Sequence, residues 1–142
     1  MLHAALIPVL YNRCYGGFCL SDVVIRAYNA ECPDRLPLHA QGADAPRTDR
    51  QLAAIVTRLR EVADGPQARL GLCWVDERFE AYVNIGEYDG YERVTVDFQR
   101  YQLDAIRRIA ADTAGIDPLQ RILCVLAEAE PIMIGSDDDD TD

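Results

Sequence analysis

The alternation of apolar and polar positions divides the first half of the chain into one strand and two helices. A continuous apolar run at 3–10 predicts a strand covered on both faces. Pro8 has no N–H to donate, so the strand lies at a sheet edge or bonds to a neighbour on its other side only. Helical spacing of apolar residues predicts a helix at 21–31 with Ser21 as its N-cap, and a second helix that begins at a capping box of Thr48 and Gln51 and ends at Gly65.

The second half of the chain predicts three strands followed by two helices. The strands are expected at 68–76, 79–87 and 91–98, and Asp89-Gly90 predicts a tight hairpin turn between the last two. The helices are expected at 99–114 and 117–131, the second with Asp117 as N-cap and Pro118 at its first position. This β-α-α-β-β-β-α-α order predicts an α/β (α+β) fold, in which about four helices pack on a mixed, mainly antiparallel sheet of about four strands. We expect one globular domain over 1–135 and a disordered acidic tail over 136–142.

Charge and composition exclude several classes of function. All 14 basic residues are arginines, so chemistry that needs a lysine nucleophile or a phosphate-binding lysine is excluded. The net charge is −10, and five of the acidic residues belong to the tail, which leaves −5 for the rest of the chain. Nucleic acids and anionic membranes bind basic surfaces, so we expect neither as a partner.

The cysteines and histidines give no sign of a disulfide framework or a metal site. Five cysteines are scattered along the chain without a CxxC pair, which is typical of reduced thiols in a cytoplasmic protein. The two histidines are too few for a zinc site built from neighbouring residues. Neither GxxxxGK nor GxGxxG occurs, so nucleotide binding is not indicated. We expect no metal and no cofactor.

The densest stretch of candidate chemistry follows the first strand: Asn12, Arg13, Cys14, Tyr15, Gly16, Gly17 and Phe18. Two glycines, an arginine and a nearby helix N-terminus form an anion site in one interpretation, and a tight turn in which Arg13 pairs with a carboxylate in the other. Cys14 is a candidate nucleophile, but no base accompanies it in the sequence, which favours a buried, unreactive thiol.

A second group of candidates consists of carboxylates. Glu87, Asp89 and Glu92 cluster on the predicted hairpin, and Asp49 opens the second helix. Such a set can do acid–base work or hold a metal, although a solvated hairpin tip is acidic for no functional reason. Tyr88 and its neighbouring tyrosines are residue types that protein interfaces favour.

Three short motifs carry a resemblance to a known family. They are Asn12–Phe18 with Leu20-Ser21, Arg47-Thr48-Asp49, and Glu87-Tyr88-Asp89-Gly90 with Glu92. Their order and spacing resemble a family of small uncharacterised proteins of large DNA viruses and bacteriophages. The resemblance implies a viral origin and no particular reaction, and it implies that the three segments meet, with Arg13 and Arg47 facing Glu87 and Asp89. Cys19 and the extension after residue 97 depart from the family pattern.

These observations lead to one expected function and two alternatives. We expect a virus-encoded protein-binding or regulatory module that forms a homodimer and contacts a host or viral protein, in the cytoplasm of an infected cell or in the virion. The first alternative is a small hydrolase or transferase that acts on a phosphorylated ligand through the arginine and carboxylate cluster. The second is a structural component of the virion.

Overall fold

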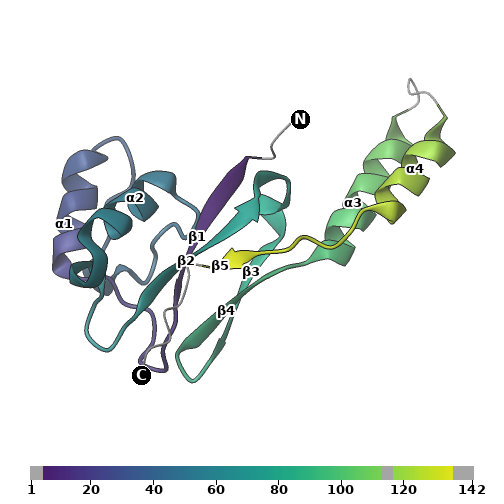
Figure 1. Cartoon of the computed structure of the whole chain (residues 1–142). Helices are drawn as coiled ribbons and strands as arrows, with labels where there is room; N and C mark the ends of the chain where they lie inside the picture. Colours follow the sequence, from purple (N-terminus) through teal and green to yellow (C-terminus); the bar gives the residue numbers. More distant parts are fainter. Residues whose placement is uncertain (1–4, 113–116, 136–142) are drawn as a thin grey trace.

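The computed structural model describes residues 5–112 and 117–135. They form a single α+β domain, whose strands and helices are drawn in Figure 1. The strands and helices are β1 (Leu6–Asn12), α1 (Asp22–Glu31), α2 (Arg50–Leu59), β2 (Leu70–Asp76), β3 (Val83–Tyr88), β4 (Tyr91–Val96), α3 (Phe98–Ala111), α4 (Pro118–Ala127) and β5 (Ile134–Gly135). Three short 3-10 helices join them: η1 (Ala40–Gly42), η2 (Arg60–Ala63) and η3 (Glu77–Tyr82). The predicted fold class is confirmed.

The strands form two small antiparallel sheets instead of one four-stranded sheet. One has the order β1-β2-β5, and the other is the hairpin β3-β4. The prediction of a strand over 79–87 is wrong in its first half, because Glu77–Tyr82 forms η3, capped by the carboxylate of Asp76. This turn of helix redirects the chain after β2, so β3 does not pair with β2. Pro8 lies at a sheet edge as expected, since β1 pairs with β2 alone.

The sheet of β1 and β2 separates two hydrophobic clusters. On one face, Leu10 and Leu72 pack against Val24 and Tyr28 of α1 and Leu52 of α2. On the other face, the alternate residues of the two strands pack against η3, β4 and α3. The members of this second cluster include Ile7, Val9, Cys73, Val75, Phe79, Val94 and Tyr101.

The helix ends confirm some sequence predictions and correct others. Ser21 caps α1 by accepting a hydrogen bond from the N–H of Val24, and Asp117 caps α4. The N-cap of α2 is Asp49 rather than Thr48. Helix α2 also ends earlier than Gly65, because Arg60 has a φ of 53°, which interrupts the helix before η2.

The hairpin between β3 and β4 turns where the sequence predicts. Tyr88 pairs with Tyr91, so the loop consists of Asp89 and Gly90 alone. Their φ angles are 51° and 88°, as a type I′ turn requires.

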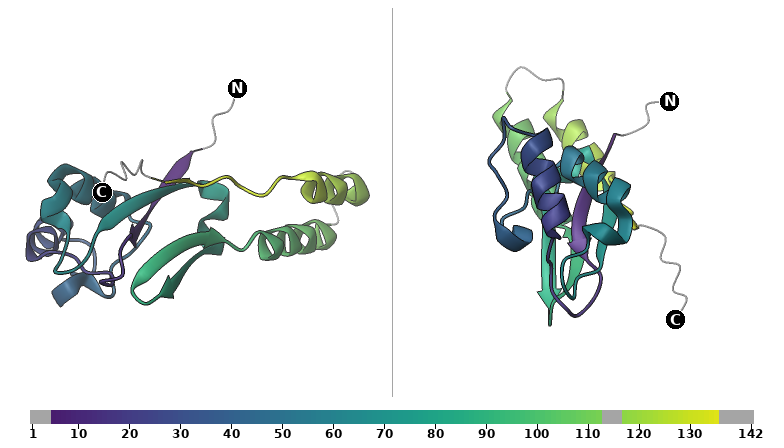
Figure 2. Two further views of the ribbon diagram at one scale, coloured as in Figure 1. Left: turned by 60° about the horizontal axis from the view of Figure 1, so that its bottom comes forward. Right: turned by 90° about the vertical axis from the view of Figure 1, so that its left-hand side faces the viewer.

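Helices α3 and α4 form a hairpin that projects from the two sheets (Figure 2). It is anchored at its base by aromatic contacts, among them an edge-on packing of Phe79 against Tyr101 with ring centroids 4.6 Å apart. None of the helices in the described part of the chain has both the length and the apolar character that crossing a bilayer requires. The predicted acidic tail at 136–142 lies outside the described residues.

Candidate functional site

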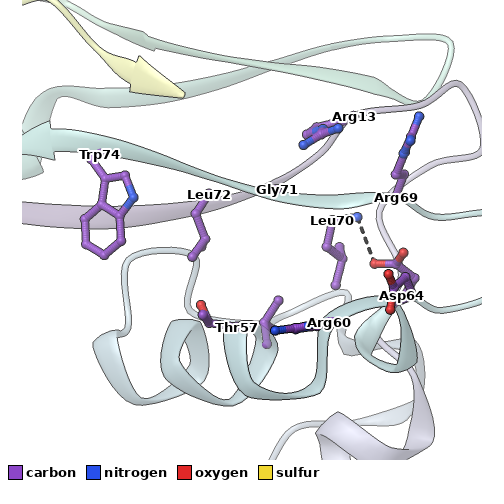
Figure 3. A pocket seen from close by; sticks show the side chains of 11 residues that line it. Arg13, Thr57, Arg60, Asp64, Arg69, Leu70, Gly71, Leu72 and Trp74 are labelled. Carbon is purple, nitrogen blue, oxygen red and sulfur yellow. Dashed lines mark hydrogen bonds between the residues drawn. The ribbon is translucent and has the colours of Figure 1, made fainter. Parts of the chain in front are cut away.

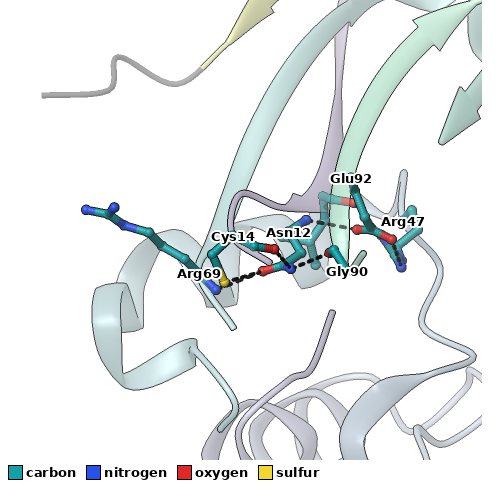
Figure 4. Close-up of polar contacts among 7 residues, drawn as sticks. Asn12, Cys14, Arg47, Arg69, Gly90 and Glu92 are labelled. Carbon is teal, nitrogen blue, oxygen red and sulfur yellow. Dashed lines mark hydrogen bonds and ion pairs between the residues drawn. The ribbon is translucent and has the colours of Figure 1, made fainter. Parts of the chain in front are cut away.

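The side chain of Asn12 is fully buried at the end of β1 and connects three segments of the chain. Its Nδ2 donates to the carbonyl of Cys14 at 2.7 Å and to that of Gly90 at 2.8 Å. Its Oδ1 accepts from the backbone N–H of Arg69 at 2.8 Å. Figure 4 shows how these bonds bring the loop after β1, the hairpin tip and the start of β2 together.

Arg47 and Glu92 form a bidentate ion pair beside Asn12. Arg47 Nη1 lies 2.8 Å from Glu92 Oε1, and Nη2 lies 3.0 Å from Oε2. Glu92 Oε1 also accepts from the backbone N–H of Asn12 at 2.8 Å, and Arg47 Nη1 donates to the carbonyl of Leu10. The guanidinium of Arg47 lies 3.4 Å from the centroid of the Phe18 ring. The three motifs therefore meet in space, and their charged groups bond to one another and to the backbone.

The pairing expected within this cluster is wrong. Arg47 pairs with Glu92, while Glu87 turns back to accept from the N–H of Gly90 at the hairpin tip. The side chain of Arg13 instead lies across Gly71 and lines a groove beside β2. The hydrogen bonds of Asn12 and the Arg47–Glu92 ion pair therefore form a structural brace between the three segments, rather than a cluster of free charges.

Gly16 of the first motif and Gly90 of the hairpin motif serve close packing. A Cβ atom at Gly16 would overlap the carbonyl of Gln67, and one at Gly90 would overlap the backbone of Tyr15 and Gly17. Gly17 has a φ of 90°, which favours glycine. The loop is thus wedged between the hairpin tip and the segment before β2, an arrangement that explains the glycines without an anion.

Among residues 5–112 and 117–135, no base accompanies the Cys14 thiol. Its Sγ donates to the carbonyl of Gln67 at 2.9 Å, and it lies 3.5 Å from Asn12 Oδ1. His39, the one histidine in the described part of the chain, is exposed and lies near Asp44. Burial raises the pKa of Cys32 and Cys73 above the ordinary value of a thiol, and burial followed by the charge of Asp22 does so for Cys19.

Asp49 caps α2 and holds the loop before it. Its Oδ1 accepts from the N–H groups of Gln51 and Leu52, at 2.8 and 3.2 Å. Its Oδ2 accepts from Tyr28 Oη at 2.8 Å and pairs with Arg35. Burial opposes ionisation of this carboxyl group, but the hydrogen bonds and the guanidinium outweigh it, so its pKa lies below the ordinary value.

The remaining candidates lie on the hairpin tip. Tyr88 and Asp89 are exposed, and the ring of Tyr15 packs on that of Tyr91 with centroids 5.4 Å apart. A hollow of about 630 Å³ lies between Tyr15 and the hairpin. Its exposed aromatic lining suits a protein contact.

A groove of about 620 Å³ runs along β2 beside α2, and three arginines line it (Figure 3). Arg60 lies on the α2 side of the strand, whereas Arg13 and Arg69 lie on its opposite side. Arg13, Arg60 and Arg69 line it together with the apolar side chains of Val56, Leu72 and Trp74. A second hollow of about 460 Å³ shares Thr57 and Trp74 with it. Sequence reasoning misses Arg60 and Arg69, which lie in no motif. Arg60 follows a helix and Arg69 precedes a strand, so only the folded structure shows that both line this groove.

Comparison with family models, with curated proteins and with solved structures finds no match to this chain. The viral resemblance therefore stays a prediction. Within residues 5–112 and 117–135, no three His, Cys, Asp or Glu side chains gather as a metal site would require.

Replacement of Asn12 tests the brace. We expect Asn12→Ala to lower the free energy of unfolding by about 3 kcal/mol, because it leaves buried backbone groups of three segments without partners. Asn29→Ala is the matched control, since Asn29 also bonds to the backbone but to Leu38 alone. It should cost about 1 kcal/mol in the same urea titration. Equal losses in the two variants would contradict the role given to Asn12.

Asp49 should make stability depend on pH. A carboxyl group whose pKa is lowered by folding stabilises the protein above its unfolded pKa, and this contribution is lost as the pH falls through the folded value. Asp49→Asn should therefore be less stable than wild type by about 1–2 kcal/mol at pH 7, and the difference should shrink below about pH 4. Tyr28→Phe keeps the carboxylate and should keep part of this pH dependence. A difference between wild type and Asp49→Asn that is constant from pH 7 to pH 3 would contradict the assignment.

Proposed function

We propose that the protein is a protein-binding module that self-associates through the α3–α4 hairpin. The observation that carries the proposal is a stripe of three leucines along α4. Leu119, Leu123 and Leu126 follow one another at i, i+4 and i+7 and are 63%, 55% and 56% exposed. Val125 on another side of the helix is buried, so α4 is apolar on two sides.

A second copy of the chain is the occupant that best fits this leucine stripe. Within the described chain, the hairpin packs on itself and projects from the sheets, so no other element covers the stripe (Figure 2). Two helical hairpins packed through their apolar sides form a four-helix bundle, a stable arrangement in which each copy covers the stripe of the other. Burying each leucine would contribute about 1 kcal/mol or more.

The alternative of an enzyme acting on a phosphorylated ligand has less support. It relied on a cluster of Arg13, Arg47, Glu87 and Asp89, but the arginines of this set lie in different places, and Arg47 is engaged by Glu92. The viral origin, the host or viral partner, a structural role in the virion and the virion location rest on the sequence resemblance alone, and the cytoplasmic location rests on it and on the pattern of cysteines.

Light scattering coupled to size exclusion tests the self-association. At micromolar concentration we expect wild type at twice the chain mass of 15.9 kDa. Leu123→Glu should shift the protein to the monomer mass, because a charge in the centre of the stripe cannot be buried without a partner.

Leu36→Glu is the matched control. Leu36 is 89% exposed in the loop after α1, far along the chain from the hairpin, and this variant should keep the dimer mass. A monomeric wild type, or a dimer that survives Leu123→Glu, would count against the hairpin as the interface.

A further inference from the structure

Strand β2 has a free edge beside the arginine-lined groove. Strand β5 pairs with Cys73 and Trp74 only, so Leu70–Leu72 have no strand neighbour on that side within the described chain. Backbone groups of alternate residues face the same edge of a strand, so those of Leu70 and Leu72 face the side on which β5 lies. The N–H of Leu70 is already bonded there to Asp64 Oδ1 at 3.0 Å. The edge at Leu72 therefore lies open between β5 and this bond.

The register of β5 directs the following residues to this edge. Cys73 pairs with Gly135 and Trp74 with Ile134. If the antiparallel register continues, Ser136 lies opposite Leu72 and Asp137 opposite Gly71. Figure 3 shows the yellow arrowhead of β5 directed along β2 towards the side of the groove on which Arg13 and Arg69 lie.

The charges of the groove and of the C-terminal residues are complementary. The side chain of Arg13 lies across Gly71, the residue that Asp137 would face. Arg60 and Arg69 lie on opposite sides of β2 near Leu70. Among residues 5–112 and 117–135, no carboxylate forms an ion pair with Arg60 or Arg69. The C-terminal segment supplies five aspartates at 137–140 and 142, which outnumber the two carboxylates of the groove, Glu61 and Asp64.

We propose that the groove along β2 beside α2 is a binding site for an extended acidic segment, and that its occupant is residues 136–142 of the same chain. Ser136 and Asp137 extend β5 along the open edge at Leu72 by strand addition. The ladder ends there, because Asp64 holds the N–H of Leu70. The following aspartates then pair with Arg13, Arg60 and Arg69. This edge offers the segment both backbone partners and opposite charge.

Trp74 provides the readout, because it is the single tryptophan of the chain, lines the groove and is 36% exposed. The test compares three full-length variants with wild type. One replaces Asp137, Asp138, Asp139, Asp140 and Asp142 by Asn. The second is Arg60→Glu with Arg69→Glu, and the third combines both sets. Arg26→Glu, on the exposed side of α1, is the matched control for charge reversal.

We expect acrylamide to quench Trp74 more strongly in the five-Asn variant and in the double arginine variant than in wild type, and the melting temperature of each to fall by about 3 °C. The combined variant should show no further change, because both sets of substitutions break the same contact. At about 1 M salt, where the Debye length is about 3 Å, wild type should approach the five-Asn variant. Arg26→Glu should behave as wild type.

Three results would overturn the proposal. The first is equal quenching of Trp74 in wild type and the five-Asn variant. The second is a change in the double arginine variant alone, which would assign the groove to a different anionic ligand. The third is additive effects in the combined variant, which would mean that the aspartates and the arginines act at separate places.

Discussion

One buried amide side chain, that of Asn12, holds the two sheets of this protein in their relative positions. It bonds the loop after β1, the start of β2 and the tip of the β3–β4 hairpin, and its own backbone N–H bonds to Glu92. Glu92 in turn is held by Arg47, which precedes α2 and also bonds to β1. Polar groups buried in this way stabilise the fold only when all of them have partners. In this network the partners come from segments up to 80 residues apart in sequence.

The separation of the two sheets has a consequence for the rest of the chain. Because η3 redirects the backbone after β2, the β3–β4 hairpin packs across one face of the β1–β2 sheet and leaves the far edge of β2 uncovered except by the two residues of β5. The α3–α4 hairpin then leaves the globular part at the end of β4. The two surfaces for which we propose partners, the leucine stripe and the arginine-lined groove, both follow from this path of the backbone.

Features encoded locally could be predicted from the sequence. Ser21 and Asp117 cap their helices as expected, and Asp89-Gly90 forms the predicted turn, because in each case the decisive contacts lie within a few residues. We predicted one sheet where the structure has two, and we predicted Thr48 as the N-cap of α2 where Asp49 takes that position. The position of η3 depends on packing of Phe79 in the second hydrophobic cluster, and Asp49 competes with Thr48 for the cap through contacts with Tyr28 and Arg35.

The candidate site likewise combines features that could be predicted from the sequence with features that could not. The motif residues Asn12, Arg47 and Glu92 were recognisable as a group, but sequence spacing could not tell which hairpin carboxylate faces Arg47. Arg60 and Arg69 could not be found at all, since only the packing of α2 beside β2 makes both of them line the same groove. Predictions from spacing therefore identified the segments that meet and missed the pairs that form.

The most direct test of the account is a double-mutant cycle of Arg47→Met and Glu92→Gln, measured as the free energy of unfolding in urea. If the bidentate pair braces the hairpin against the first sheet, each single change should cost about 3 kcal/mol, and the double variant should lose much less than the sum. We predict a coupling energy of about 2 kcal/mol or more between the two positions. A coupling energy below about 0.5 kcal/mol would show that the two side chains act independently, and would contradict the brace as the interaction on which the fold depends.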